Sequence, residues 1–322
     1  MKIGFIGLGN VGAKLAGSLV RNGNAVVVHD LDKSAATPLL EAGAQWGDSG
    51  RAVAEACDVI MTCLPSPAAS ARVLEGPGGV LEGLSEGKFW LEISTTDAED
   101  FKRLAGLVAD KGAIALDTPV SGGCHRAATG NIAIFAGGPR DAFETVLPLL
   151  TTIGRKVVHT GPLGSASVLK VITNYLAGVQ LLSTGEALMV ARKAGIDLAV
   201  AYNAIRVSSG NSFVHETEGQ VILNGSYDVE FTMDLEYKDL SLFDNLGTSL
   251  GVPLELSPVC VDIIRDGLDR YGPRALSTSI VRRLEEACDA DLRAPGFPAT
   301  LVDSEPEEAG AEVVVHNRRG YL

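Results

Sequence analysis

The most constraining feature of this sequence is a glycine-rich turn between a short apolar strand and an amphipathic helix. Gly7-Leu8-Gly9-Asn10-Val11-Gly12 has the spacing G-x-G-x-x-G and follows the apolar segment Ile3–Ile6. In such a unit the first glycine permits a tight turn, the second lets the backbone approach a pyrophosphate, and the third lets the helix pack on the strand. Because 37 glycines make chance matches easy, it is the strand–turn–helix context that predicts a dinucleotide site at the helix N-terminus.

Short β-branched runs alternate with helical segments over about the first 160 residues. That alternation is typical of a parallel sheet covered by helices on both faces. We therefore predict an α/β Rossmann domain over residues 1–163. The expected strands are Ile3–Ile6, Ala25–His29, Val59–Cys63, Phe89–Ile93, Ile114–Leu116, Ile132–Ala136 and Val157–His159.

The strand signal vanishes after Gly164. Residues 165–194 have the pattern of one long helix, and shorter helical segments follow it to about residue 288. We predict an all-α C-terminal domain over residues 164–292, joined to the first domain by this long helix. Residues 293–322 have the composition of an extended tail, with the acidic run Glu305-Pro306-Glu307-Glu308 and the basic run His316-Asn317-Arg318-Arg319. We expect the tail to become ordered only against a partner subunit.

Charge and composition exclude several classes of partner. A net charge of −13 and a pI near 4.9 oppose binding to a phosphate backbone, so we expect no nucleic-acid partner. The five cysteines lack the spacing of a zinc site, which predicts no metal and a reducing, cytoplasmic location. We expect no signal peptide, because no basic segment followed by an apolar stretch and a cleavage site precedes the first expected strand. The longest apolar stretch, residues 163–195, contains charged and amide side chains that exclude a membrane span, namely Lys170, Asn174, Gln180, Glu186 and Arg192.

The end of the second expected strand bears on the choice of nucleotide. Asp30 lies 18 residues after the last glycine of the turn, where a carboxylate accepts hydrogen bonds from the adenosine ribose and would repel a 2′-phosphate. Leu31 follows it in place of the arginine that often binds such a phosphate. We predict NAD, with NADP possible because His29 and Lys33 are nearby cations. In the alternative interpretation, Asp30 only caps the next helix.

Four blocks of the sequence, in order, resemble the β-hydroxyacid dehydrogenase family, typified by 3-hydroxyisobutyrate dehydrogenase. The resemblance covers about residues 1–290 and leaves the tail outside it. The blocks are Gly4-Phe5-Ile6-Gly7-Leu8-Gly9-Asn10-Val11-Gly12; Asp117-Thr118-Pro119-Val120-Ser121-Gly122-Gly123 with Gly130-Asn131; Gly161-Pro162-Leu163-Gly164 with Lys170 and Asn174; and Lys238-Asp239-Leu240.

The resemblance implies where the cofactor and substrate bind. Leu64-Pro65 and Thr95 would line the nicotinamide side of the cofactor, which agrees with their place after the ends of expected strands. Ser121-Gly122-Gly123 would bind the substrate carboxylate through backbone N–H groups and a hydroxyl; the alternative is a plain turn. Lys238 would close over cofactor and substrate; the alternative is a solvated helix lysine.

Lys170 is the candidate acid/base. It interrupts the apolar stretch Val168–Ile172, so its side chain either reaches the surface or lies in a cleft. Given the motif around it, we interpret Lys170 as the group that exchanges the hydroxyl proton during hydride transfer. Apolar neighbours and a nearby cation both lower the pKa of a lysine toward neutrality. Asn174, one turn later, would contact the substrate hydroxyl or hold Lys170; the alternative is an amide buried between helices.

The resemblance implies an NAD-dependent oxidoreductase for a small, carboxylate-bearing 3-hydroxy acid or its semialdehyde, with hydroxyisobutyrate, glycerate and threonate as candidate acids, and a homodimer or homotetramer. His125 and Arg126 depart from the family pattern after the substrate loop, and either demand a more oxygenated acid or lie on the surface. Three other classes of protein are alternatives. A 6-phosphogluconate dehydrogenase-like enzyme would have histidine where Thr173 stands, and imine reductases and non-catalytic cofactor-binding modules would lack Lys170.

Overall fold

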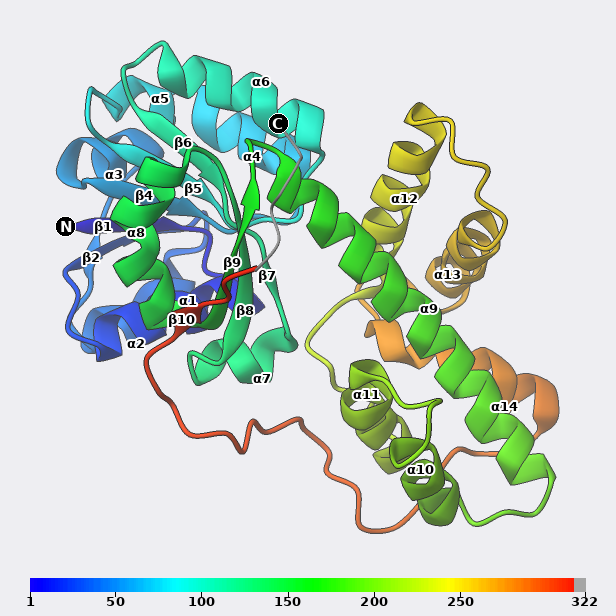
Figure 1. Ribbon diagram of the computed structural model, residues 1–322. Coiled ribbons are helices and arrows are strands. Elements are labelled where there is room, and N and C mark those ends of the chain that lie inside the picture. The colour runs from blue at the N-terminus through cyan, green and yellow to red at the C-terminus, as the bar shows by residue number, and fades with distance from the viewer. Residues whose placement is uncertain (316–322) are drawn as a thin grey trace. The chain divides into compact units, whose positions relative to one another are not determined.

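The computed structural model describes residues 1–315 and divides the chain into two compact units (Figure 1). Residues 1–170 and 303–315 form the N-terminal unit, and residues 171–302 form the C-terminal unit. Lys170 is therefore the last residue of its segment of the N-terminal unit. The basic run His316-Asn317-Arg318-Arg319 lies outside the described residues. Within the described chain, no helix is both long and apolar enough to cross a lipid bilayer.

A ten-stranded sheet forms the centre of the N-terminal unit, with the order β10-β9-β8-β6-β5-β4-β1-β2-β3 and β7 paired to β8. The seven strands expected from the sequence are confirmed to within a few residues at each end. Three further strands, β3, β7 and β10, have only two residues each. The strands are β1 (Ile3–Ile6), β2 (Val26–His29), β3 (Gln45–Trp46), β4 (Val59–Thr62), β5 (Phe89–Glu92), β6 (Ile114–Asp117), β7 (Val120–Ser121), β8 (Ile132–Gly137), β9 (Gly154–Gly161) and β10 (Ala311–Glu312).

Helices cover both faces of this sheet, as predicted (Figure 1). Successive side chains of a strand point to opposite faces, so Ile3 and Phe5 join one hydrophobic cluster while Ile6 joins another. Helices α1 and α8 complete the first cluster, and α3, α4, α5 and α6 complete the second. The helices are α1 (Asn10–Arg21), η1 (Lys33–Ala36), α2 (Thr37–Glu41), α3 (Gly50–Ala56), α4 (Pro67–Glu75), α5 (Val80–Gly83), α6 (Ala98–Ala109), α7 (Gly123–Ala128) and α8 (Arg140–Ile153).

The sheet is mainly parallel, as predicted, and becomes antiparallel around β8. Strands β1 to β6 are parallel to their neighbours, but β8 runs antiparallel to both β6 and β7. After β6 the chain passes through β7 and the helix α7 into β8. Strand β8 folds back beside β7 as an antiparallel pair, and it therefore also runs antiparallel to β6.

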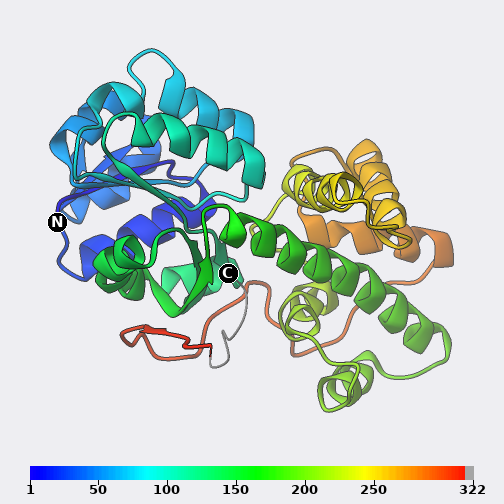
Figure 2. The same ribbon diagram turned by 45° about the horizontal axis from the view of Figure 1, so that its top comes forward.

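Helix α9 (Ser165–Lys193) is the predicted long helix, and it passes from one unit into the other at Lys170. In the C-terminal unit the later helices pack around it (Figure 2), and Leu181 and Leu188 of α9 belong to the hydrophobic core there. The prediction of an all-α domain is confirmed for this unit. Its other helices are α10 (Leu198–Arg206), α11 (Phe213–Asn224), α12 (Met233–Ser249), α13 (Ser257–Tyr271), η2 (Ser277–Val281) and α14 (Arg282–Cys288).

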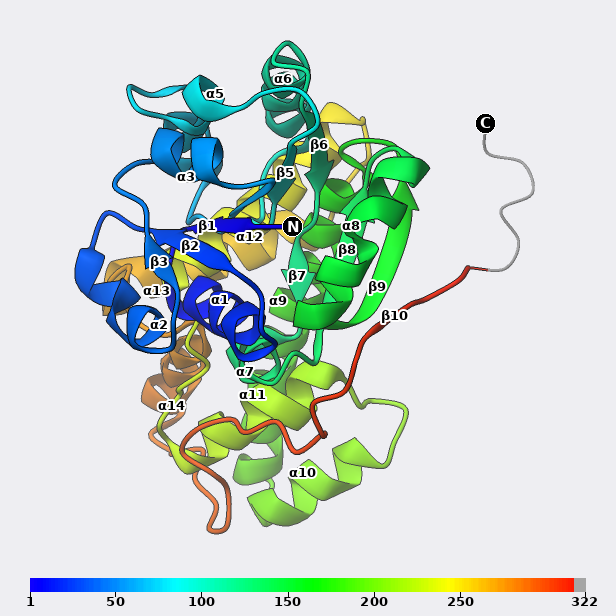
Figure 3. The same ribbon diagram turned by 90° about the vertical axis from the view of Figure 1, so that its left-hand side faces the viewer.

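The described end of the chain packs on the protein's own N-terminal unit, contrary to the expectation that it needs a partner subunit. Strand β10 lies beside β9 at the edge of the sheet (Figure 3). Ala311 pairs with Lys156 and Glu312 with Val157, in parallel register. This pairing provides hydrogen-bond partners for backbone N–H and C=O groups of β9 that would be unpaired if β9 were the edge strand.

Candidate active site

The glycine-rich turn has the geometry that a dinucleotide phosphate site requires. Gly7 has φ = +96°, and a Cβ there would lie 2.3 Å from the Cys63 carbonyl oxygen. A Cβ on Gly12 would lie 2.1 Å from the Gly7 carbonyl oxygen, whereas one on Gly9 would meet nothing within 4 Å. Gly9 therefore faces open space at the first turn of α1, where helix N–H groups lack intrahelical partners. The residues present fit the pyrophosphate of a nicotinamide dinucleotide.

Asp30 braces this turn from the end of β2. Its Oδ2 accepts the Leu8 N–H at 2.6 Å and its Oδ1 accepts the Asp32 N–H at 2.9 Å. The alternative in which Asp30 caps the next helix is wrong, because Asp32 is the N-cap of η1 and accepts the Ser34 N–H. Each carboxylate oxygen of Asp30 accepts one of these bonds and has a second lone pair, so the carboxylate is equipped to accept from a ribose hydroxyl as well.

The last residues of five parallel strands stand in one row across the sheet. Ile6 pairs with His29 on one side and with Thr62 on the other, Thr62 pairs with Glu92, and Glu92 with Asp117. Every loop that follows these residues therefore leaves the sheet at the same edge. These loops carry the site residues predicted for the N-terminal unit, apart from Lys170 and the substrate loop that follows β7. In open α/β sheets, ligands bind in the crevice outside this edge.

A buried carboxyl joins the two loops predicted to line the nicotinamide. Glu92 accepts hydrogen bonds at Oε1 from the N–H and the hydroxyl of Ser94, and the Ser94 Oγ accepts the Leu64 N–H at 2.7 Å. Burial raises the pKa of Glu92, against the lowering effect of these donors. Leu64 and Thr95 are half-buried and Pro65 is exposed. The network fixes the backbone of one loop relative to the other.

A second buried carboxyl attaches helix α9 to the sheet. Asp117, at the end of β6, accepts the Gly164 N–H at 2.9 Å, and the N–H and hydroxyl of Ser167 at 2.7 and 3.1 Å. Burial raises the pKa of Asp117, while the donors act in the opposite direction. The bonds cap the N-terminus of α9. Lys170, one turn later, is only 8% exposed, so its side chain does not extend into bulk water.

The substrate loop follows β7, where Ser121 pairs with Ala133 of β8. Gly122 and Gly123 have φ of +129° and +85°, values that side chains disfavour. His125 and Arg126, which depart from the family pattern, have different surroundings. An ideal Cβ on Gly123 would lie 3.0 Å from the His125 ring, so this ring lies against the loop. Arg126 instead forms an ion pair at 3.0 Å with Glu305 of the tail.

In the C-terminal unit, a third buried carboxyl brings two of the predicted residues together. Asp239, which is 2% exposed, accepts a hydrogen bond from the side-chain amide of Asn174. The Lys238 ammonium lies 2.9 Å from Asp239 Oδ1, with its own side chain 20% exposed. Asn174 is therefore held by α12, and Lys238 stands beside the same carboxylate.

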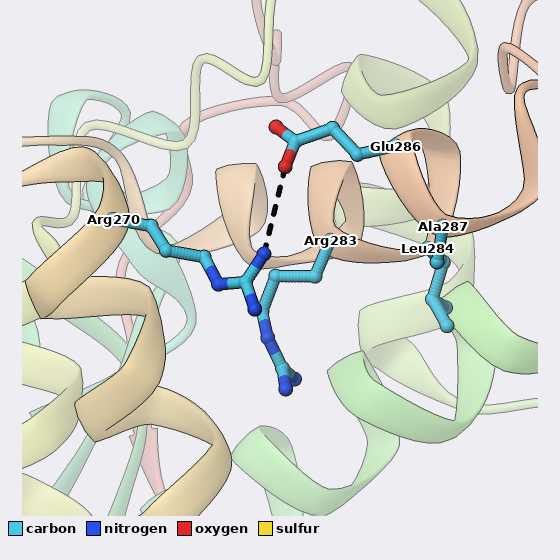
Figure 4. A pocket seen from close by; sticks show the side chains of 5 residues that line it. All are labelled: Arg270, Arg283, Leu284, Glu286 and Ala287. Atoms are coloured by element: carbon cyan, nitrogen blue, oxygen red, sulfur yellow. Dashed lines mark ion pairs between the residues drawn. The ribbon is translucent and has the colours of Figure 1, made fainter.

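A hollow on the C-terminal unit lacks the character of a substrate site. Five residues of α13 and α14 line it (Figure 4), namely Arg270, Arg283, Leu284, Glu286 and Ala287. Its guanidinium groups already form ion pairs: Arg270 with Asp266 at 2.8 Å and with Glu286 at 3.7 Å, and Arg283 with Asp266 at 2.5 Å. Among residues 1–315, no cluster of three or more His, Cys, Asp or Glu side chains could hold a metal ion.

Sequence reasoning named the side chains expected to touch ligands and overlooked the three carboxylates that hold them, Glu92, Asp117 and Asp239. Asp117 and Asp239 stand inside the quoted family blocks, and Glu92 and Asp117 each end a strand. An acidic residue at the end of an apolar parallel strand was the available signal, because burying a carboxylate there costs free energy unless N–H groups or hydroxyls donate hydrogen bonds to it.

Comparison with known proteins agrees with this geometry. Residues 2–161 match the family model described as the NAD binding domain of 6-phosphogluconate dehydrogenase. Residues 164–284 match the one described as NAD-binding of NADP-dependent 3-hydroxyisobutyrate dehydrogenase. Nicotinamide dinucleotide binding by the chain therefore has support over both units.

Individual relatives extend over most of the chain. It is 34% identical over 268 residues to 2-(hydroxymethyl)glutarate dehydrogenase of Eubacterium barkeri, covering 83% of this chain and 89% of that protein. It is 33% identical to the mitochondrial 3-hydroxyisobutyrate dehydrogenase of Rattus norvegicus, covering 82% and 81%. A crystal structure of 3-hydroxyisobutyrate dehydrogenase from Salmonella typhimurium superposes with a TM-score of 0.80 and 29% identity, covering 88% of this chain and 99% of that one.

Proposed function

Since the chain belongs to the β-hydroxyacid dehydrogenase family, we propose that it oxidises a small 3-hydroxy acid, or reduces the matching semialdehyde, with NAD as cofactor and Lys170 as acid/base. Family membership makes it an NAD(P)-dependent 3-hydroxyacid dehydrogenase. The identity of the acid, the preference for NAD and the role of Lys170 are the parts that we propose.

One observation carries the proposal: Lys170 is buried one turn into a helix whose N-terminus is fixed to the carboxyl edge of the sheet. Asp117 makes that attachment, and Asp117 stands in the same row as the strand ends that precede the glycine-rich turn and the two nicotinamide loops. Lys170 is 8% exposed, and burying an ammonium group costs free energy. A lysine whose role was only to increase solubility would be expected at an exposed position instead.

The chain's own residues would bind, orient and move one proton. When bound, nicotinamide supplies the hydride acceptor in oxidation and the hydride donor in reduction. Lys170, as the neutral amine, would take the hydroxyl proton at Nζ during oxidation and return it during reduction. The Ser121 hydroxyl and the N–H groups of Gly122 and Gly123 would bind the carboxylate. Lys238 would supply a second positive charge from the helical unit.

The surroundings of Asp30 support the proposed preference for NAD. A 2′-phosphate beside this carboxylate would be repelled, and Leu31, which is fully exposed, provides no compensating cation. The two cations noted in the sequence have other neighbours: His29 Nδ1 lies 2.8 Å from the Gly47 carbonyl oxygen, and the Lys33 ammonium lies 5.2 Å from the Trp46 ring centroid. Asp30→Ala is expected to narrow the preference for NAD over NADP.

The decisive experiment is turnover by Lys170→Met across a panel of 3-hydroxy acids that includes 3-hydroxyisobutyrate, 2-(hydroxymethyl)glutarate and threonate. We expect kcat to fall by ~10²–10⁴-fold, the usual contribution of a general acid/base. NADH binding, followed by its fluorescence, should stay within about twofold of wild type, because the glycine-rich turn is unaltered. The pH profile of kcat/KM should lose an ionisation between about pH 6 and 9.

Lys193→Met is the matched control, since it removes a second lysine from the same helix. The Lys193 ammonium donates to the Cys288 carbonyl oxygen in the C-terminal unit, and we expect near-normal turnover. Equal turnover by Lys170→Met and wild type would defeat the assigned role of Lys170. Failure of the wild type on every acid of the panel would defeat the proposed substrate class.

We extend the proposal to the setting of the enzyme, a homodimer or homotetramer in the cytoplasm. Free thiols at all five cysteines fit a reducing compartment. Several large apolar side chains on α9 and α10 are exposed, among them Val190 at 69% and Val200 at 61%, as is typical of surfaces that another subunit covers. Sedimentation equilibrium would measure the assembly directly.

A further inference from the structure

We propose that residues 303–312, here called the C-terminal strap, position the substrate loop Ser121–Gly123 by holding helix α7 and Asn131. The proposal rests on the function proposed above in one respect, namely that this loop binds the substrate carboxylate. Both matched family models end by residue 284, so the strap is an addition to the part of the chain that those models describe.

Three side-chain contacts connect the strap to the segment that follows the loop. Asp303 Oδ2 accepts a hydrogen bond from the Thr129 hydroxyl at 2.5 Å and another from the Asn131 side-chain amide at 2.7 Å. Glu305 forms the ion pair with Arg126 at 3.0 Å. Because α7 begins at Gly123 and ends at Ala128, these contacts fix the far end of a six-residue helix whose first residue belongs to the loop.

Through Asn131, the strap also contacts a buried side chain of the N-terminal unit. Its side chain is 3% exposed, and its amide nitrogen donates to Asp303 and to the Glu305 carbonyl oxygen. Both acceptors belong to the strap, so a chain without it would leave these two hydrogen bonds unmade. A buried amide that loses its acceptors either rearranges or draws in water, and the adjoining α7 segment would move with it.

The rest of the strap is anchored along the same unit. Glu307 binds Arg21 at 2.9 and 3.2 Å, Glu308 binds Arg155 at 2.6 Å, and Glu312 binds Arg140 at 2.6 and 2.9 Å. Exposed ion pairs are individually weak and are screened by salt, but these occur together with the β10–β9 pairing. Gly310 adds a steric requirement, because a Cβ there would lie 1.9 Å from the Gly154 carbonyl oxygen.

The test compares two single substitutions in the full-length protein. Asp303→Ala removes the acceptor of Thr129 and Asn131, whereas Glu308→Ala removes the same charge at a point of the strap that contacts Arg155 on β9. For Asp303→Ala we expect KM for the hydroxy acid to rise by roughly fivefold, the effect of one net hydrogen bond. Its kcat and NADH affinity should remain within about twofold of wild type.

Hydrogen exchange supplies a readout that does not depend on turnover. Backbone amides of residues 120–128 should exchange faster in Asp303→Ala than in wild type, while Glu308→Ala should match wild type there. Truncation after Val302 should reproduce the Asp303→Ala effect or exceed it. The positioning role is wrong if Asp303→Ala and Glu308→Ala have the same effect on KM and on the hydrogen-exchange rate of residues 120–128. It is also wrong if neither variant changes these two quantities. If exchange responds but the wild type turns over no hydroxy acid, the strap's role survives and the proposed function fails.

Discussion

Substitution of Asp117 is the sharpest test of how the N-terminus of helix α9 is held. In Asp117→Asn, one side-chain oxygen remains to accept an N–H, but the amide NH₂ must face the second donor. One of the Gly164 and Ser167 N–H groups, bonded at 2.9 and 2.7 Å in the wild type, is then buried without an acceptor. A buried donor left unsatisfied costs ~1–3 kcal/mol, so we expect a loss of ~2–3 kcal/mol in the free energy of unfolding.

Urea denaturation followed by tryptophan fluorescence measures this loss, since both tryptophans, Trp46 and Trp90, lie in the N-terminal unit. Asp110→Asn is the matched control: it makes the same chemical change in the same unit, at an exposed residue after α6, and should stay within ~0.5 kcal/mol of wild type. The kcat of Asp117→Asn should also fall, because Lys170 lies one turn further along α9. If the two variants unfold at the same urea concentration, the capping argument is refuted.

Two further predictions concern the nucleotide site and a buried acid. Gly12→Ala should weaken NADH binding by more than about tenfold in a fluorescence titration, because its Cβ would lie 2.1 Å from a backbone oxygen; Gly17→Ala on the same helix, with its nearest contact at 3.7 Å, should bind normally. Burial raises the pKa of Glu218, whose Oε2 has no hydrogen-bond partner, to about 8 from an ordinary value of 4.5. The stability this residue contributes is thus present below about pH 4.5 and lost as pH rises through 8. Glu218→Gln should raise the melting temperature more at pH 9 than at pH 5 by calorimetry, and an equal gain at both pH values would contradict the assignment.

The secondary structure was predictable where elements were long or strongly apolar. All seven expected strands and the long helix α9 formed within a few residues of their expected bounds. The overlooked strands β3, β7 and β10 have two residues each, too few for any alternation of apolar and polar side chains to be visible. The antiparallel direction of β8 was overlooked for the same reason, since it depends on pairing with the two-residue strand β7.

The tail shows a different limit. The sequence shows that the tail is acidic, but its composition does not predict which Arg or Lys side chains form ion pairs with it. Arg21 and Arg126, two of its ion-pair partners, are separated from Glu307 and Glu305 by well over a hundred residues. Each of these pairs is weak on its own and leaves no local pattern in the sequence. The sequence therefore indicated an extended segment, and an external partner was the wrong inference from it.

By itself, the sequence determined the dinucleotide fold, the division into an α/β and an all-α part, and the names of the residues expected to touch ligands. It could do so because glycine spacing and strand and helix periodicity are local, and each is imposed by the backbone geometry of a few consecutive residues. Tertiary structure alone decided that Asp117 caps α9, that Glu92 joins the two nicotinamide loops, and that the strap supports Asn131. Those contacts join residues far apart in the chain, and a buried carboxylate or amide is stable only where the complete fold supplies its hydrogen-bond partners.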